Sequence, residues 1–159
     1  MSYIITGLEP NAYAALFALP DDELAALGAR RIVADTDRGY PCRVSLEDAR
    51  AGERLLLVNH ASNAVDGPYR SAFAIFVREQ ARQATYRDAL PPAFKGRPLS
   101  LRAYDADGVL VAARLSPTDD GHGTAIRDLL AEPRVDHIDA HNAAHGCFAA
   151  RIERAGDAA

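Results

Sequence analysis

Short apolar or alternating runs separated by turn residues are the feature that most restricts the fold of this chain. A first short run, YIIT, spans residues 3–6. Seven more follow: RRIVAD (30–35), ERLLLVN (53–59), AFAIFVRE (72–79), LSLRAY (99–104), GVLVAARL (108–115), VDHIDAH (135–141) and CFAARIE (147–153). Runs of this length bounded by glycine, proline or aspartate are typical of strands, and the DADG turn at 105–108 is typical of a hairpin. The pattern predicts a largely antiparallel sheet.

Helical spacing is confined to three segments. Residues 9–19 (EPNAYAALFAL) and 21–28 (DDELAALG) predict two helices near the start, and residues 124–132 (TAIRDLLAE) predict a late one. We therefore predict an α+β fold. Its mostly antiparallel sheet has about seven strands and either stays open or curls towards a barrel, with two N-terminal helices and one late helix.

Composition and charge exclude several classes of partner. The chain has 159 residues, 48% of them hydrophobic and 25% charged, which predicts one globular domain over residues 1–159. A formal net charge of −4 repels a phosphate backbone, so we expect no nucleic-acid partner. The sequence contains no apolar run long enough to predict a membrane span, and its first ten residues, MSYIITGLEP, do not resemble a signal peptide. We expect a cytoplasmic protein in which Cys42 and Cys147 are reduced.

The most specific prediction concerns residues 135–153. If NAAHG (142–146) is the loop of a hairpin, His141 lies opposite Cys147 and His137 lies opposite Arg151. One face then carries the polar residues and the other the apolar ones. The predicted polar face holds His137, Asp139, His141, Cys147, Arg151 and Glu153, and the predicted apolar face holds Ile138, Ala140, Phe148, Ala150 and Ile152.

This hairpin allows three interpretations of Cys147. As a nucleophile, it would use His141 as its base, with Asp139 orienting the imidazole. As a metal ligand it would join Asp139, His141 and His145, but the usual zinc spacings are missing, so we expect no metal and no cofactor. In the third interpretation Cys147 is a small strand residue on a solvated face.

Arginines on or beside the strands are candidate ligand-binding residues. An arginine within an apolar strand needs a partner, because an unpaired buried charge is costly. Either carboxylates pair with these arginines, or the arginines line a pocket for a small anion. The candidate ligand-binding set is Arg43, Tyr69, Arg78, Arg102, Asn142 and Arg151. His60 and His122 lie in loop-like contexts, and we expect them to be solvated.

Four stretches together resemble the bacterial domain-of-unknown-function family 1203. They are GYPCRVSLEDARAGERLLL (39–57), PYRSAFAIFVRE (68–79), LSLRAYDADG (99–108) and DAHNAAHGCFAARIER (139–154). The resemblance implies a single-domain bacterial protein and no particular activity. The chain departs from the family pattern at Asp139, where a histidine is usual, and at Phe73-Ala74, where Gly-Pro is usual. His141, Asn142, Gly146 and Cys147 match it.

Three functions remain open. The first is a small soluble domain that binds a small, anionic ligand near the His141/Cys147 hairpin. The second is an enzyme with Cys147 as nucleophile and His141 as base. The third is a structural module, such as a homodimer built on an exposed sheet edge or on the N-terminal helices.

Overall fold

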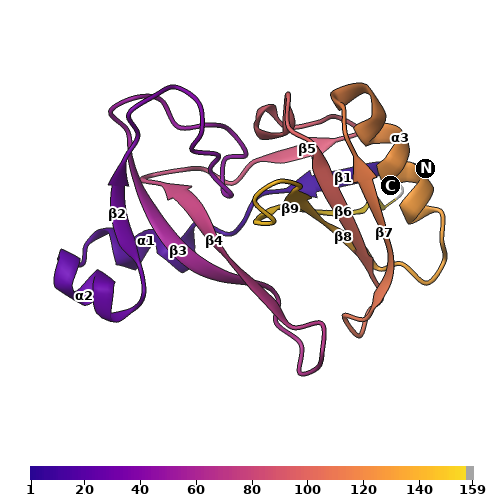
Figure 1. Ribbon diagram of the computed structural model, residues 1–159, viewed down its shortest axis with the longest axis horizontal. Helices are drawn as coiled ribbons and strands as arrows, with labels where there is room; N and C mark the ends of the chain where they lie inside the picture. The colour runs from indigo at the N-terminus through magenta and orange to yellow at the C-terminus, as the bar shows by residue number, and fades with distance from the viewer. Residues whose placement is uncertain (157–159) are drawn as a thin grey trace.

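Two antiparallel sheets make up most of the molecule (Figure 1). The computed structural model describes residues 1–156, which form nine strands, three α-helices and one 3-10 helix at Pro92–Phe94. The helices are α1 (Asn11–Phe17), α2 (Asp21–Ala26) and α3 (Asp119–Leu130). The strands are β1 (Tyr3–Thr6), β2 (Arg30–Val33), β3 (Arg54–Asn63), β4 (Ser71–Arg78), β5 (Thr85–Arg87), β6 (Leu99–Tyr104), β7 (Leu110–Ser116), β8 (His137–Asn142) and β9 (Phe148–Arg154).

The larger sheet has six strands in the order β5-β1-β9-β8-β6-β7. Side chains along each strand point alternately to its two faces. One face carries Leu99 and Leu101 of β6, Ile138 of β8 and Ile152 of β9. Helix α3 covers this face with Ile126 and its neighbours, which closes the first hydrophobic core. The opposite face of the sheet carries the polar side chains of β8 and β9.

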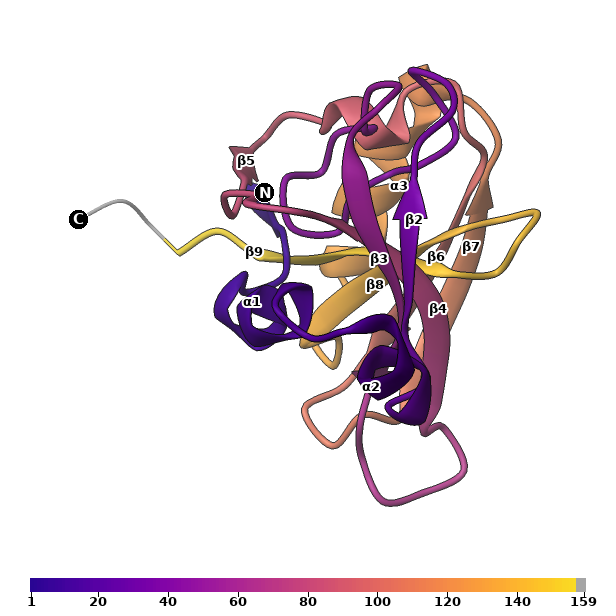
Figure 2. The ribbon, with the colours of Figure 1, turned by 90° about the vertical axis from the view of Figure 1, so that its left-hand side faces the viewer.

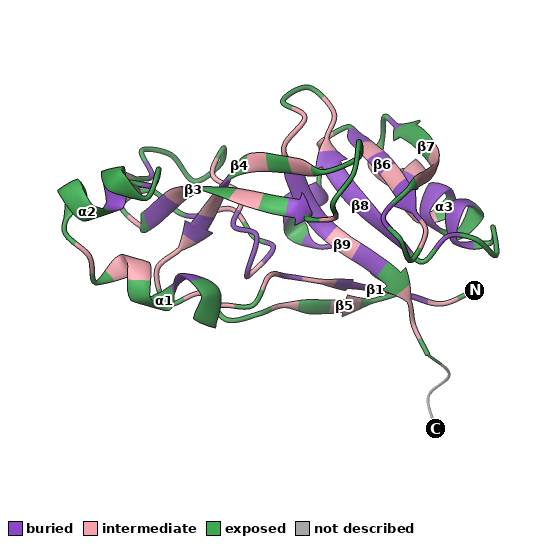
Figure 3. Cartoon of the chain, turned by 90° about the horizontal axis from the view of Figure 1, so that it is seen from below, coloured by how far each residue is buried: buried purple, intermediate pink, exposed green. Residues whose placement is uncertain are grey.

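The smaller sheet, β2-β3-β4, lies against this polar face and runs across β9 (Figure 2). A second core lies beneath it, formed by Leu56, Ile75 and Val77 of the sheet, Leu24 of α2 and Phe148 of β9. Phe148 therefore joins the two sheets. Figure 3 shows that β8 and β9 are buried over most of their length, whereas α1 and α2 are largely exposed.

The predicted α+β class with mostly antiparallel strands is confirmed. The strands divide into two sheets, and the larger one is open, with β5 and β7 at its edges, so it does not close into a barrel. The late helix begins at Asp119, five residues before the predicted start at Thr124. No helix among the described residues is both long and apolar enough to cross a membrane.

The early start of α3 makes the prediction of a solvated His122 wrong. The side chain is fully buried. Its Nδ1 lies 2.7 Å from the Ser116 hydroxyl, and its Nε2 lies 3.2 Å from the Arg97 carbonyl. The two glycines beside His122 suggest a loop, but tertiary contacts outweigh their low helix propensity.

Candidate functional site

The β8–β9 hairpin forms, but its register differs from the prediction by two residues. His137 pairs with Glu153, Asp139 with Arg151 and Ala140 with Ala150. The predicted pairs His141–Cys147 and His137–Arg151 are therefore wrong. A two-residue slip leaves every side chain on its original face, so the polar and apolar pattern cannot detect it.

A β-bulge changes the direction of Phe148. The register skips Ala149, so that Phe148 pairs with His141. The two rings lie 6.0 Å apart, and Phe148 enters the core beneath the small sheet. Its predicted place on the apolar face with Ala150 and Ile152 is therefore wrong, whereas those two residues do pack in the core under α3.

Cys147 lies at the end of the hairpin loop, half-buried and free. Arg43 donates a hydrogen bond from Nη2 to its Sγ at 3.1 Å, and Asn142 donates from Nδ2 at 3.4 Å. Among the hydrogen bonds of the described residues, none joins Cys147 to His141. The two nitrogen donors on the sulfur come from Arg43 and Asn142, both of which belong to the predicted ligand-binding set.

Arg43 is a buried cation, with only 3% of its surface exposed. Its Nε donates to the Phe148 carbonyl at 2.7 Å, its Nη1 donates to the Pro41 carbonyl, and its Nη2 donates to Cys147. No carboxylate of the described residues forms an ion pair with it. Burial lowers the pKa of Arg43, and the hydrogen bond to the Cys147 sulfur opposes this shift.

A cleft of about 550 Å³ opens beside this cluster. Arg43, Asn142 and Cys147 form its polar side, and the hairpin-loop residue His145 also lines it. Its apolar walls come from two strands and two loops: Leu57, Phe73, Ala74, Phe76, Pro41 and Pro98. Arg97 lines the cleft as well, but it already holds Asp48 through two hydrogen bonds at 2.7 and 2.8 Å. Of the two arginines that line this cleft, Arg43 is thus the one that has no carboxylate partner among the described residues.

His141 is fully buried and lies outside the lining of the cleft. Its ring packs on Phe73, with centroids 4.9 Å apart. Burial, aided by the charge of Arg102, lowers its pKa from 6.5 to about 4. The ring is therefore neutral at neutral pH, and Nδ1 donates to the Gly146 carbonyl at 3.1 Å. Its Nε2 is buried without a hydrogen-bond partner.

The remaining predicted site residues are dispersed. Asp139 is fully buried and binds Arg151 through Oδ1 at 3.0 Å and Oδ2 at 3.3 Å, so it orients an arginine instead of His141. Arg78 binds Glu53 at 2.6 Å. Arg151 lines a second cleft, described below.

Arg102 and Tyr69 lie outside both clefts. The Arg102 guanidinium stands over the Phe73 ring, 5.7 Å from its centroid. Tyr69 is exposed in the connection between β3 and β4.

Several residues with aromatic rings line the clefts but were not among the predicted site residues. Phe73 and Phe76 form one wall beside Cys147, and the signal for them was the aromatic content of AFAIFVRE. His60 lies within β3, half-buried, and its ring lies 5.2 Å from Phe148, so the prediction that it is a solvated loop residue is wrong. The strand containing it runs four residues beyond the apolar segment that identified it.

A family model described as "Protein of unknown function (DUF1203)" matches residues 39–154. None of the curated proteins and none of the solved structures matches the chain. All residues that line the cleft beside Cys147 fall within the matched segment.

Proposed function

This chain belongs to the DUF1203 family, whose description states no activity, and we propose from its geometry that Cys147 reacts as a thiolate with a small, largely apolar electrophile. The electrophile would occupy the 550 Å³ cleft beside the hairpin loop. The observation that carries the proposal is the buried Arg43 guanidinium, which has no carboxylate partner among the described residues and donates to the Cys147 sulfur.

A buried cation needs a compensating negative charge, because transfer of an isolated ion from water is costly. Two of the three acceptors of Arg43 are neutral carbonyls, those of Pro41 and Phe148. The third acceptor is the Cys147 sulfur, and it can carry a charge. A thiolate accepts hydrogen bonds from Arg43 and Asn142 together, and charge-assisted bonds of this kind are stronger than neutral ones. The buried Arg43 cation therefore favours the ionised sulfur.

A sulfur ionised beside the Arg43 cation would need no general base. His141 is neutral and hydrogen-bonded to a backbone carbonyl, so the base role predicted for it is not part of this proposal. In the reaction, the Sγ electron pair forms a bond to the electrophilic atom of the bound molecule. The bond to the leaving group breaks, and the leaving group departs with its electron pair. Leu57, Phe73 and Phe76 provide apolar surface for the rest of the molecule.

Binding of a small anion, the first of the three functions predicted from the sequence, competes with this proposal. Each nitrogen of Arg43 already has one acceptor, so only the second N–H groups of Nη1 and Nη2 are left for an anion. A thiolate next to the guanidinium would also repel it. One function requires a largely apolar electrophile and the other an anionic ligand, which makes them separable by experiment.

The test is the rate of alkylation of Cys147 at about pH 6, where an ordinary thiol is almost fully protonated. Cys42 is fully buried and is therefore silent in the native chain, and the Cys147→Ser variant gives its contribution in the unfolded chain. We expect iodoacetamide to label the native chain at least about tenfold faster than the urea-unfolded chain, as followed by intact mass. An aromatic electrophile should show a larger native advantage than iodoacetamide.

Ala74→Trp should slow labelling by the aromatic reagent, because Ala74 lines the cleft. Ala72→Trp is the matched control, since Ala72 is exposed on the same strand and outside the cleft. Native labelling no faster than unfolded labelling would contradict the proposal. Slow labelling combined with saturable binding of acetate would support the anion-binding function in its place.

A further inference from the structure

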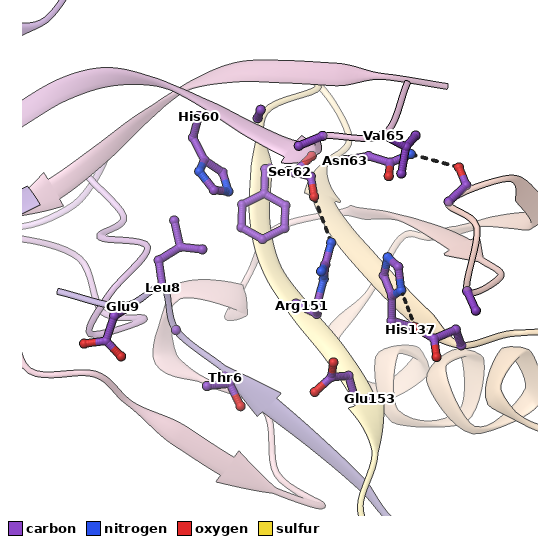
Figure 4. A pocket seen from close by; sticks show the side chains of 17 residues that line it. Thr6, Leu8, Glu9, His60, Ser62, Asn63, Val65, His137, Arg151 and Glu153 are labelled. Carbon is purple, nitrogen blue, oxygen red and sulfur yellow. Dashed lines mark hydrogen bonds and ion pairs between the residues drawn. The ribbon is translucent and has the colours of Figure 1, made fainter. Parts of the chain in front are cut away.

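A second cleft, of about 690 Å³, lies between the end of β3 and the strands β8 and β9 (Figure 4). Figure 4 shows Ser62, Arg151, His137 and Glu153 gathered along its wall, with Glu9 on the segment that follows β1. Cys147 does not line this cleft, so a ligand bound here does not depend on the reactivity of that residue.

His137 presents an unused hydrogen-bond acceptor on this wall. The residue is only 7% exposed, and its ring stacks on Tyr104 with centroids 5.6 Å apart. Its Nδ1 lies 2.9 Å from the Asp136 carboxylate, which as an anion can only accept, so Nδ1 carries the proton. When the ring is uncharged, the lone pair is therefore on Nε2, and this atom is buried without a partner.

Ser62 supplies a second unpartnered atom on the same wall. The residue is 8% exposed, and its Oγ is buried without a hydrogen-bond partner. Its position is fixed, because its carbonyl accepts Nη2 of Arg151 at 2.8 Å. Buried polar atoms in native proteins are nearly always paired, so these two atoms are candidates for hydrogen bonds to a ligand in the cleft.

The charges around the cleft are predominantly negative. The Arg151 cation is matched by Asp139, which is fully buried behind it. Glu9 and Glu153 are exposed, and neither forms an ion pair within the part of the chain that the structure describes. The carboxylates of this cleft therefore outnumber its cations.

We propose that this cleft binds a small organic amine in its ammonium form, with His137 and Glu153 accepting its N–H groups. The two residues are direct partners in the β8–β9 ladder, which places their Cβ atoms about 4.5–5.5 Å apart and lets both reach one ammonium group. Among the described residues, no three histidine, cysteine or carboxylate side chains are grouped to hold a metal ion. The size of the cleft also fits an organic molecule.

Calorimetric titration of the full chain at low ionic strength tests the proposal with three matched probes. They are the four-carbon diamine putrescine, the corresponding four-carbon diol and succinate. We expect putrescine to bind, the diol to bind at least about tenfold more weakly, and succinate not to bind. Equal affinity for the diamine and the diol, or tighter binding of succinate, would overturn the assignment.

Glu153→Gln should weaken putrescine binding by roughly tenfold while the far-ultraviolet circular dichroism is unchanged. Glu23→Gln is the control, because Glu23 is an exposed carboxylate on α2, outside this cleft. Cys147→Ser should leave putrescine binding intact, which separates this site from the thiolate cleft. If Glu153→Gln binds putrescine as tightly as the native chain, the proposed site is wrong.

Discussion

Replacing Arg43 with methionine removes the charge that faces Cys147 while keeping most of the apolar stem. The guanidinium lies 3.1 Å from the sulfur and is 3% exposed. At an effective dielectric constant of about 20, two unit charges at this separation attract by about 5 kcal/mol. Desolvation of both groups offsets most of this attraction. A residual of only ~1.4 kcal/mol still changes the thiolate population about tenfold.

The substitution also affects folding. The carbonyls of Pro41 and Phe148 lose their donor, and each buried unsatisfied carbonyl costs about 1–3 kcal/mol. The substitution also removes the desolvation cost of the buried guanidinium charge, which offsets part of this loss. We therefore expect the free energy of unfolding to fall by about 2 kcal/mol. Arg43→Lys is the companion variant, because it keeps the charge but loses the planar fork.

The assay combines the ultraviolet absorbance of the thiolate with the rate of iodoacetamide labelling, each measured as a function of pH. Cys147→Ser provides the background from Cys42. We expect Arg43→Met to lower both signals at least about tenfold near pH 6, and Arg43→Lys to give an intermediate result. If the folded Arg43→Met protein kept the native labelling rate, the reasoning from an uncompensated buried cation would be refuted.

Three further predictions concern stability, each measured by urea unfolding. Burial lowers the pKa of His141 in the folded chain to about 4, so the unfolded chain binds the proton first as the pH falls. The free energy of unfolding should therefore fall by about 2 kcal/mol between about pH 7 and pH 5. His141→Phe should remove most of this pH dependence. Asp139→Asn should lower the free energy of unfolding by about 3 kcal/mol, because it leaves Arg151 without its carboxylate. The value is modest because the Arg151 side chain is 37% exposed. Adding Arg151→Met should restore part of the lost stability. Gly7→Ala should lower the free energy of unfolding by at least about 1–3 kcal/mol, because the added Cβ would lie 1.9 Å from the Val44 carbonyl oxygen. Gly67→Ala should leave the stability nearly unchanged, because nothing lies within 4 Å of its added Cβ. An unchanged pH dependence in His141→Phe, an unaltered Asp139→Asn or a stable Gly7→Ala would each contradict its argument.

The strands were predictable because alternation records which face of a sheet is buried. Ile138, Ala150 and Ile152 lie on the apolar face as their spacing predicts. The exact register was not predictable, since a two-residue slip preserves the faces, and a bulge at Ala149 has no local sequence signature.

The candidate site depends on contacts between residues that are distant in the sequence. His141 precedes Cys147 by six positions and suggested a catalytic pair, but the sulfur accepts from Arg43, which precedes it by 104 residues. Local spacing carries no information about such a partner. The neighbouring Cys42 and Arg43 of the PCR stretch (41–43) indicated only that the Arg43 charge needs a partner, and not which residue provides it.

The position of β1 has a consequence for the order of folding. β1 lies inside the larger sheet, hydrogen-bonded to β5 on one side and to β9 on the other. Among the strands of the described residues, β1 is synthesised first, and its partner β9 is synthesised last. Its polar backbone groups on that side stay unpaired until β9 emerges, and the connection that must close spans nearly the whole chain. Such non-local pairing slows folding and lengthens the time during which an apolar strand edge is available to other chains. We therefore expect the larger sheet to be completed late, and the edge of β1 to be exposed to other chains until then.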